Sequence, residues 1–187
     1  TTPTGRFGRI IGSLGEPGPN VVVVWSVASA KEVNRLQGQV AAFALDCEHV
    51  VSGHHKEVLV WKAVGSTTPV AKLRGHADVV YAVAGGPDGT RAASGGKDMT
   101  VRIWDVPNQK ELHCLKGHKA PIRAVAISPD GKRALSACEG GDLRLWDVET
   151  GTEIIAWEKA HDGAIWCVTF SPGGRKAATS SADRTVR

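Results

Sequence analysis

Short hydrophobic segments recur along the chain and are separated by turns that contain Gly and Pro. Four of them follow one another at 122–128, 133–137, 143–148 and 153–157. The breaks between these segments include SPDGK and VETG, where Pro fixes φ and Gly allows a positive φ. Because each segment is too short for a helix and ends in turn residues, the pattern predicts four short β-strands joined by tight turns.

The four-strand pattern repeats along the chain. His76, His118 and His161 lie 42 and 43 residues apart, in the segments RGHADVVYAV, KGHKAPIRAV and KAHDGAIWCV. A small hydroxyl residue follows each histidine by 18 positions, and a Trp-Asp pair follows the first two hydroxyl residues by ten. The residues concerned are Ser94, Ser136 and Thr179, with the tryptophans Trp104 and Trp146. Four strands every ~40 residues are typical of a β-propeller blade.

In its Gly-His, Ser-Pro-Asp-Gly and Trp-Asp motifs the chain resembles the WD-repeat β-propeller family, closely over 38–187 and loosely over 5–37. The resemblance implies an all-β propeller of four-stranded antiparallel blades, with about four and a half blades in this chain. We expect one propeller domain with five units. These are a partial blade at 1–39 (second to fourth strands), a degenerate blade at 40–76, blades at 77–118 and 119–161, and a partial blade at 162–187 (first strand to the start of the third).

A histidine, a serine, an aspartate and a tryptophan have the spacing of a structural hydrogen-bonded tetrad in this family. The resemblance assigns that role to His76, Ser94, Asp98 and Trp104. A hydrolytic Ser-His-Asp set is the alternative. The sequence shows no oxyanion donor or nucleophile elbow, and we expect no catalytic residue and no enzymatic activity.

The other copies contain only part of the tetrad. One has His118, Ser136 and Trp146, with Gly140 at the aspartate position and Asp142 two residues late. The last has His161, Thr179 and Asp183 and stops before a tryptophan, while Gln39 replaces the histidine in the degenerate blade. We therefore expect blades of unequal stability, with 40–76 the least stable.

The spacing of apolar residues at the start of each repeat predicts a β-bulge. Val80 and Val83, like Ile122 and Val125 and like Ile165 and Val168, are three apart, which a regular strand does not place on one face. The residues inside the bulges are Tyr81, Arg123 and Trp166. The resemblance implies that this position opens toward the top of the central channel and contacts partners. We interpret these three as partner-binding residues, with Val79 and Pro121 as an apolar floor and Lys97 on the adjoining turn; ordinary rim residues are the alternative.

Composition and charge indicate which kinds of partner the chain is expected to bind. The net charge is +4 and no run of five like charges occurs, which favours a protein or peptide partner over nucleic acid. No apolar run approaches ~20 residues, so we expect no contact with a membrane.

Cys47, Cys114, Cys138 and Cys167 lack CxxC spacing and indicate buried free thiols in the cytoplasm. The adjacent His54 and His55 are interpreted as part of an exposed turn, and no metal or cofactor is expected.

The leading functional hypothesis is a non-enzymatic protein-protein interaction scaffold that presents a partner-binding top face. One alternative is a regulatory or targeting module of a larger multidomain protein, for example one joined to a bacterial kinase. Another is an anion- or nucleic-acid-binding platform. Because the expected strands are too few for a ring of about seven blades, we expect either a piece of a longer protein or self-assembly through the unfinished terminal strands. Trp157, on a fourth strand, is expected to pack against the next blade or lie on the surface.

Overall fold

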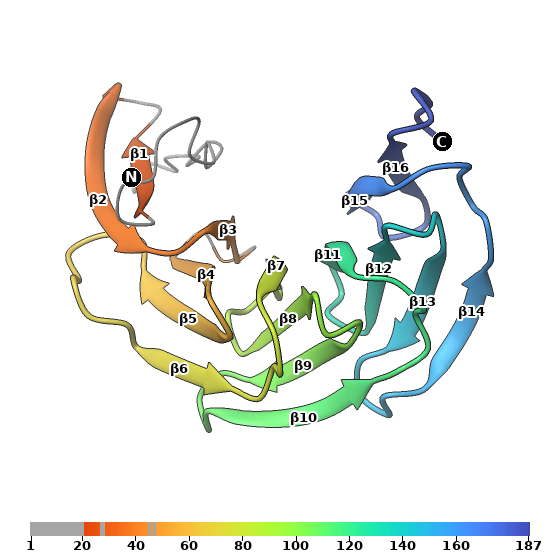
Figure 1. Cartoon of the computed structure of the whole chain (residues 1–187). Helices are drawn as coiled ribbons and strands as arrows, with labels where there is room; N and C mark the ends of the chain where they lie inside the picture. Colours follow the sequence, from red (N-terminus) through yellow and green to blue (C-terminus); the bar gives the residue numbers. More distant parts are fainter. Residues whose placement is uncertain (1–20, 27–28, 45, 47) are drawn as a thin grey trace.

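A computed structural model describes residues 21–26, 29–44, 46 and 48–187. Strands are the only regular elements in these residues, and every pair of neighbouring strands is antiparallel. The chain is therefore all-β, as the sequence predicts, and its sheets follow one another along an open arc (Figure 1). The strand expected near residues 8–12 lies outside the described residues.

Three of the sheets contain four strands in sequence order, so each is a meander of hairpins. The first contains β3 (Val40–Phe43), β4 (His49–His54), β5 (Glu57–Lys62) and β6 (Ala71–Arg74). The second contains β7 (Val80–Gly85), β8 (Arg91–Gly96), β9 (Val101–Asp105) and β10 (Lys110–Leu115). The third contains β11 (Ile122–Ile127), β12 (Arg133–Cys138), β13 (Leu143–Asp147) and β14 (Glu153–Trp157), close to the four strands predicted there.

A two-stranded sheet stands at each end of the described arc. One pairs β1 (Val21–Ser26) with β2 (Lys31–Gln37), and the other pairs β15 (Ile165–Phe170) with β16 (Ala177–Ser181). Beyond β16, Arg187 exchanges two backbone hydrogen bonds with Thr179, at 2.9 and 3.0 Å. These bonds are the start of a third strand on β16.

The first strand of each sheet lies toward the middle of the arc. In Figure 1, β3, β7, β11 and β15 stand side by side there, and β7 contacts both β3 and β11. The fourth strands β6, β10 and β14 follow the outer rim (Figure 1). Side chains at the start of each inner strand are therefore neighbours in space although they are about 42 residues apart in sequence.

The hydrophobic core lies between neighbouring sheets. Trp104, which is 1% exposed, packs in one cluster with Val58 and Leu73 of the preceding sheet. Trp146 packs in another with Val101 and Ile103. Burying one large aromatic side chain contributes roughly 2–3 kcal/mol, so each sheet is stabilised by the one before it.

Candidate functional site

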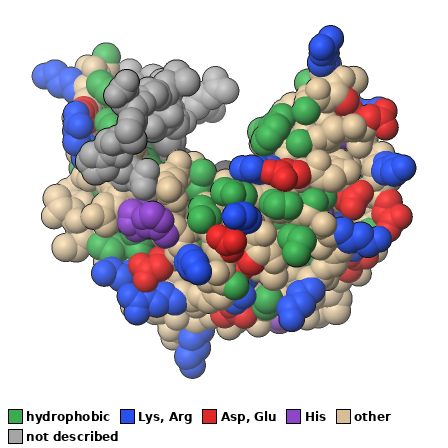
Figure 2. Space-filling view, viewed as in Figure 1, with side chains coloured by type: hydrophobic (Ala, Val, Ile, Leu, Met, Phe, Trp, Pro, Cys, Tyr) green, Lys and Arg blue, Asp and Glu red, His purple; other side chains and the backbone are tan. Residues whose placement is uncertain are grey.

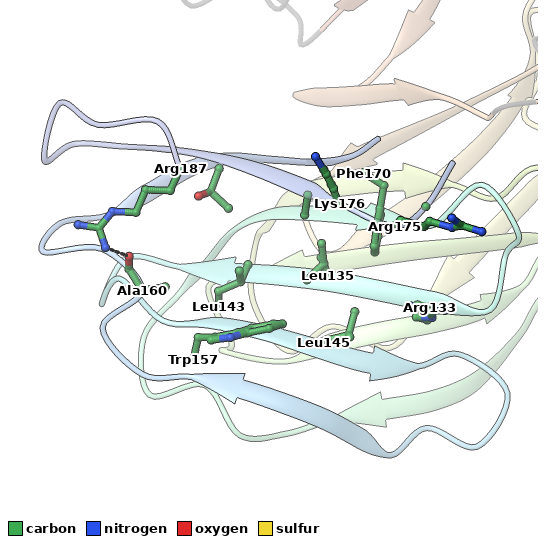
Figure 3. A pocket seen from close by; sticks show the side chains of 13 residues that line it. Arg133, Leu135, Leu143, Leu145, Trp157, Ala160, Phe170, Arg175, Lys176 and Arg187 are labelled. Atoms are coloured by element: carbon green, nitrogen blue, oxygen red, sulfur yellow. Dashed lines mark hydrogen bonds between the residues drawn. The ribbon is translucent and has the colours of Figure 1, made fainter. Parts of the chain in front are cut away.

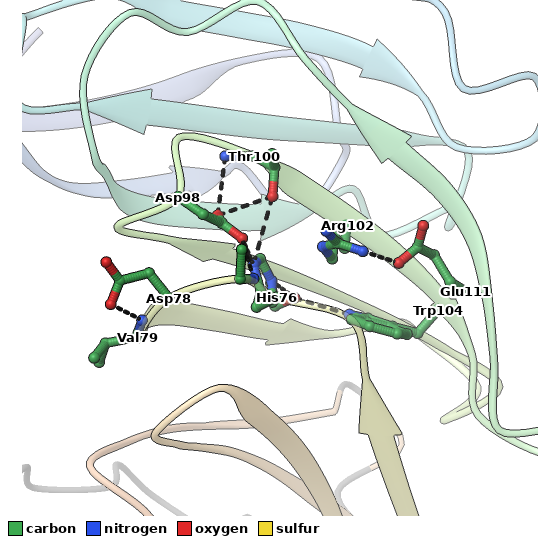
Figure 4. A network of polar contacts seen from close by, with 10 residues as sticks. His76, Asp78, Val79, Asp98, Thr100, Arg102, Trp104 and Glu111 are labelled. Atoms are coloured by element: carbon green, nitrogen blue, oxygen red, sulfur yellow. Dashed lines mark hydrogen bonds and ion pairs between the residues drawn. The ribbon is translucent and has the colours of Figure 1, made fainter.

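Hydrogen bonds join the four predicted tetrad residues of the β7–β10 sheet, three of which, His76, Asp98 and Trp104, are labelled in Figure 4. His76 Nδ1 lies 2.9 Å from Asp98 Oδ2, and His76 Nε2 lies 2.7 Å from Ser94 Oγ. Trp104 Nε1 donates to the same Ser94 oxygen at 2.8 Å. The Thr100 hydroxyl donates to Asp98 Oδ1 at 2.9 Å, a bond that also holds the turn between β8 and β9.

These contacts define one consistent chain of donors. Because the indole N–H of Trp104 donates to Ser94, the Ser94 hydroxyl is free to donate to His76 Nε2, which places the imidazole proton on Nδ1, facing Asp98. Burial lowers the pKa of His76, and this outweighs the opposing effect of Asp98. Ser94 is 0% exposed. The hydroxyl that joins the imidazole to the indole is therefore fully buried.

The β15–β16 sheet contains the corresponding set without a tryptophan. His161 Nδ1 lies 2.8 Å from Asp183 Oδ2, and His161 Nε2 lies 2.7 Å from Thr179 Oγ1. Thr185 occupies the place of Thr100 and donates to Asp183 Oδ1 at 2.7 Å. Three of the four positions are thus joined in the predicted way.

The β11–β14 sheet joins a histidine, a serine and a tryptophan. His118 Nε2 lies 2.7 Å from Ser136 Oγ, and Trp146 Nε1 donates to that oxygen at 2.8 Å. Asp142 does not contact His118, because its Oδ1 accepts a hydrogen bond from the Lys159 N–H at 2.9 Å. His118 Nδ1 is buried and has no hydrogen-bond partner.

The degenerate β3–β6 sheet replaces the imidazole with backbone contacts. Trp61 Nε1 donates to Ser52 Oγ at 2.9 Å, and that hydroxyl donates to the Gln37 carbonyl at 2.6 Å. Gln39 Oε1 accepts from the His55 N–H at 3.1 Å. The serine-tryptophan bond is thus kept without a histidine. The lower stability expected for 40–76 stays a prediction.

Each of the three predicted bulges lies at the expected residue. Strand register shifts between Val80 and Ala82, between Ile122 and Ala124, and between Ile165 and Cys167. The extra residues are Tyr81, Arg123 and Trp166, which we call the bulge patch. A bulge leaves its extra residue outside the ladder and re-aims the side chain. The same local device therefore acts on three neighbouring inner strands.

The structure brings the three side chains of the bulge patch together. The guanidinium carbon of Arg123 lies 4.0 Å from the ring centroid of Tyr81 and 5.6 Å from that of Trp166. Its Nε also donates to Glu139 Oε1 at 2.7 Å. Cation–π contacts of this kind contribute about 0.5–2 kcal/mol each, depending on exposure. Arg123 is therefore fixed between two aromatic rings by its own fold.

The other predicted partner-binding residues are Val79, Pro121 and Lys97. Val79 and Pro121 lie two residues before Tyr81 and Arg123, and backbone hydrogen bonds join them to the neighbouring turns. The Val79 carbonyl accepts the Lys97 N–H at 2.8 Å, and the Pro121 carbonyl accepts the Glu139 N–H at 3.0 Å. Lys97 Nζ lies 3.8 Å from Asp78 Oδ2. The sequence reasoning missed Asp78 and Glu139, since no periodic pattern marks the partner of a surface ion pair.

The bulge patch and the inner strands line an open hollow of about 280 Å³. Its wall includes Val40, Val83, Val125 and Val168 as well as the three patch residues. Trp166 is 54% exposed at its edge. The patch thus offers an aromatic surface beside an open hollow.

A larger groove lies between the β11–β14 and β15–β16 sheets (Figure 3). Its volume is about 510 Å³. Leu143, Leu145, Trp157 and Phe170 supply its apolar surface. Trp157 is 40% exposed there, which agrees with the expected surface position. Basic side chains stand at its margin, namely Arg133, Arg175, Lys176 and Arg187.

Away from this groove, acidic and basic side chains of the described residues are interspersed and do not form patches of one charge. Figure 2 shows acidic and basic groups interspersed over the described part of the visible face. No three His, Cys, Asp or Glu side chains among the described residues gather as metal ligands. Within the same residues no helix has the length and hydrophobicity to cross a membrane.

Two expectations about single residues were wrong. His54 is not in the exposed turn but is the last residue of β4 and half-buried, since the strand continues one residue further than its sequence indicates; His55 is exposed. Among the described thiols Cys138 is buried and Cys114 half-buried, but Cys167 is exposed. Ala82 and Ala124, at the equivalent positions after the same bulge, are buried by the neighbouring inner strands, whereas β15 has a neighbouring inner strand on one side only among the described residues. Cys47 lies outside the described residues.

The sheets, bulges and tetrads together define a repeat protein of the propeller class. The family described as "WD domain, G-beta repeat" matches the chain at residues 67–105, 109–147 and 153–187. These segments make up more than half of the sequence, and the chain belongs to this family.

Several characterised proteins share part of this sequence. "Small ribosomal subunit protein RACK1y" of Oryza sativa subsp. japonica is 43% identical over 67 residues, which are 35% of this chain and 20% of that protein. "Ribosome biogenesis protein WDR12 homolog" of Brugia malayi is 40% identical over 65 residues, 32% of this chain and 15% of that protein. "Protein Notchless" of Drosophila melanogaster is 35% identical over 63 residues, 34% and 13% respectively. The matches thus span a fifth or less of the length of these relatives.

Proposed function

We propose that this chain is a non-enzymatic protein-interaction scaffold whose partner-binding surface is the bulge patch. Val79 and Pro121 form the floor beside it, and Lys97 stands on the adjoining turn. One observation carries the proposal. The same bulge recurs on three neighbouring inner strands and gathers two aromatic side chains around one arginine, within 4.0 and 5.6 Å.

The residue types and their rigidity both support binding. Tyr, Trp and Arg are enriched among the residues that contribute most to protein interfaces. Arg123 is already held between Tyr81 and Trp166 and bonded to Glu139, so that it loses little conformational entropy when a partner arrives. Trp166 is 54% exposed, which leaves a large apolar area to bury.

The partner that fits this surface is a protein or peptide. A peptide can cover the exposed indole and the open 280 Å³ hollow at the same time. The names of the relatives, which refer to a ribosomal subunit and to ribosome biogenesis, support a role in protein assemblies. The scattered charges in Figure 2 do not favour nucleic acid. We place this function in the cytoplasm, where the free thiols of Cys114 and Cys138 stay reduced.

The test measures peptide binding before and after removal of the patch. Peptides selected on the wild-type chain from a displayed library are titrated against a variant with Tyr81, Arg123 and Trp166 all changed to Ala. We expect Kd to rise at least ~30-fold, because a single interface residue of this type can contribute about 2 kcal/mol. Equal binding by a triple variant that keeps the wild-type circular dichroism spectrum overturns the proposal.

A matched control removes a similar amount of exposed apolar surface elsewhere. Leu112, Ile154 and Ile155 are exposed hydrophobic residues on the outer strands β10 and β14. Changing all three to Ala should leave Kd within about threefold of wild type. An equal loss of affinity in this control assigns binding to general surface hydrophobicity instead of the bulge patch.

A further inference from the structure

The turn between β12 and β13 differs from its two counterparts at one position. Twenty-two residues after each tetrad histidine stand Asp98, Gly140 and Asp183. The flanking turn residues keep their conformation, since Met99, Gly141 and Arg184 all have positive φ at the next position. One sheet of the three therefore has the turn without its carboxylate.

In the two sheets that have the carboxylate, one of its oxygens accepts two hydrogen bonds. Asp98 Oδ2 lies 2.9 Å from His76 Nδ1 and accepts the Ala77 N–H at 2.9 Å. Asp183 Oδ2 makes the equivalent contacts with His161 Nδ1 at 2.8 Å and the Asp162 N–H at 3.2 Å. The pair of donors, one imidazole and one backbone amide, is a built receptor for one carboxylate oxygen.

The electrostatics of these two sites favour the ionised carboxylate. Burial raises the pKa of Asp98, but the hydrogen bonds and charge of His76 outweigh burial and lower it below its usual range. The Thr185 hydroxyl makes the largest contribution to lowering the pKa of Asp183, and the hydrogen bonds from His161 and the Asp162 N–H lower it further. A carboxylate is thus the form that this donor pair stabilises.

The same two donors are present in the β11–β14 sheet with no acceptor. His118 is 7% exposed, and its Nδ1 has no hydrogen-bond partner. The backbone N–H of Lys119, which corresponds to those of Ala77 and Asp162, donates to no residue that the structure describes. The bonds of Ser136 to His118 Nε2 and Trp146 hold the imidazole with its Nδ1–H toward the Gly140 position.

Both nearby carboxylates are engaged elsewhere. Asp142 Oδ1 accepts the Lys159 N–H at 2.9 Å. Glu139 Oε1 accepts the Arg123 Nε–H at 2.7 Å, which turns it toward the bulge patch. Neither side chain supplies the acceptor that His118 lacks.

The Gly140 position has room for the first carbon of a side chain and lies at the surface. A Cβ placed there would have as its nearest atoms Ala120 Cβ at 3.5 Å and Cys138 Sγ at 3.6 Å, both ordinary contacts. Gly140 itself is exposed. The charges of Arg144 and Asp142 act on the pKa of His118 in opposite directions, and burial lowers it most. Because His118 Nδ1 is itself buried, an anion would reach it only by entering past the exposed Gly140.

We propose that His118 Nδ1 and the Lys119 N–H form a binding site for an external carboxylate at Gly140. The ligand takes the place that Asp98 and Asp183 occupy in the other sheets. The carboxylate is either that of an acidic side chain on a partner protein or that of a free small acid. This site is distinct from the bulge patch and does not rest on its function.

The experiment follows the two donors directly by nuclear magnetic resonance. The ¹⁵N-labelled chain at pH 7 is titrated separately with sodium acetate, with acetyl-aspartate-amide, and with sodium chloride at matched ionic strength. We expect saturable shifts of the Lys119 amide and the His118 imidazole with both carboxylates and none with chloride. Tighter binding of the blocked aspartate than of acetate assigns the site to a partner side chain, and the reverse order assigns it to a free acid.

Two variants provide the controls. Gly140→Asp supplies the carboxylate within the chain, so it should reproduce the bound-state shifts and weaken acetate binding at least tenfold. Gly140→Asn fills the same space without charge and should shift the Lys119 amide less. The proposal is overturned if neither carboxylate shifts the two resonances of the wild type. It is also overturned if Gly140→Asp, folded by its amide spectrum, still responds to acetate as the wild type does.

Discussion

Replacement of Ser94 by alanine tests the structural role of the tetrad. The change removes one oxygen that is 0% exposed and that contacts both Trp104 Nε1, at 2.8 Å, and His76 Nε2, at 2.7 Å. Each buried polar group left without a partner costs about 1–3 kcal/mol. Because two such groups are created, we expect the free energy of unfolding to fall by about 3 kcal/mol.

The measurement is urea unfolding followed by circular dichroism, with Trp104→Phe added to complete a double-mutant cycle. In the Ser94→Ala background the indole N–H is already unpaired, so its removal should cost less there, with a coupling energy of about 1 kcal/mol or more. Ser66→Ala, which removes a solvent-exposed hydrogen bond from the hydroxyl to the Thr68 carbonyl, is the control and should change stability by less than about 0.5 kcal/mol. If the two changes are additive within about 0.3 kcal/mol, the hydrogen bond from Trp104 to Ser94 does not contribute to stability and the reasoning is refuted.

Three further outcomes follow from single positions. Burial, followed by the charge of Arg144, lowers the pKa of His118 from 6.5 to about 4. Because only the unfolded chain then binds this proton, urea unfolding should show stability falling as pH drops from 6.5 to about 4, and less so in His118→Gln. Gly141→Ala should lower Tm strongly, since φ is +86° and a Cβ would lie 2.1 Å from the His161 carbonyl oxygen. Iodoacetamide should label exposed Cys167 before buried Cys138, as followed by mass spectrometry.

The features that repeat along the chain were predictable from the sequence. The strands of the third copy depended only on local hydrophobic pattern and turn residues. The bulges followed from an apolar spacing of three, as between Val80 and Val83, because a regular strand turns such residues to opposite faces. The tetrad spacing was readable for the same reason. In the three sheets that have the histidine, 18 residues separate it from its hydroxyl partner.

The features that depend on contact between copies were not predictable. Arg123 lies between Tyr81 and Trp166 only because their three inner strands stand side by side, and its partner Glu139 belongs to a turn with no repeated residue. Asp142 likewise accepts a hydrogen bond from the Lys159 N–H, and His118 Nδ1 is left without a partner. The pattern of residues within one copy does not indicate with which of several nearby charged groups a side chain forms an ion pair or a hydrogen bond.

In the β7–β10, β11–β14 and β15–β16 sheets the same internal hydrogen bonds accompany different side chains at the bulge. Beneath each inner strand the hydroxyl oxygens of Ser94, Ser136 and Thr179 lie 2.7 Å from a histidine Nε2, so the strands are held alike. The bulge above then carries Tyr81, Arg123 or Trp166 without altering those bonds, because its side chain lies outside the ladder. Substitution at the bulge can therefore change the binding surface at little cost to folding. Loss of the turn carboxylate at Gly140 is a change of another kind, because it leaves a buried donor to be satisfied from outside.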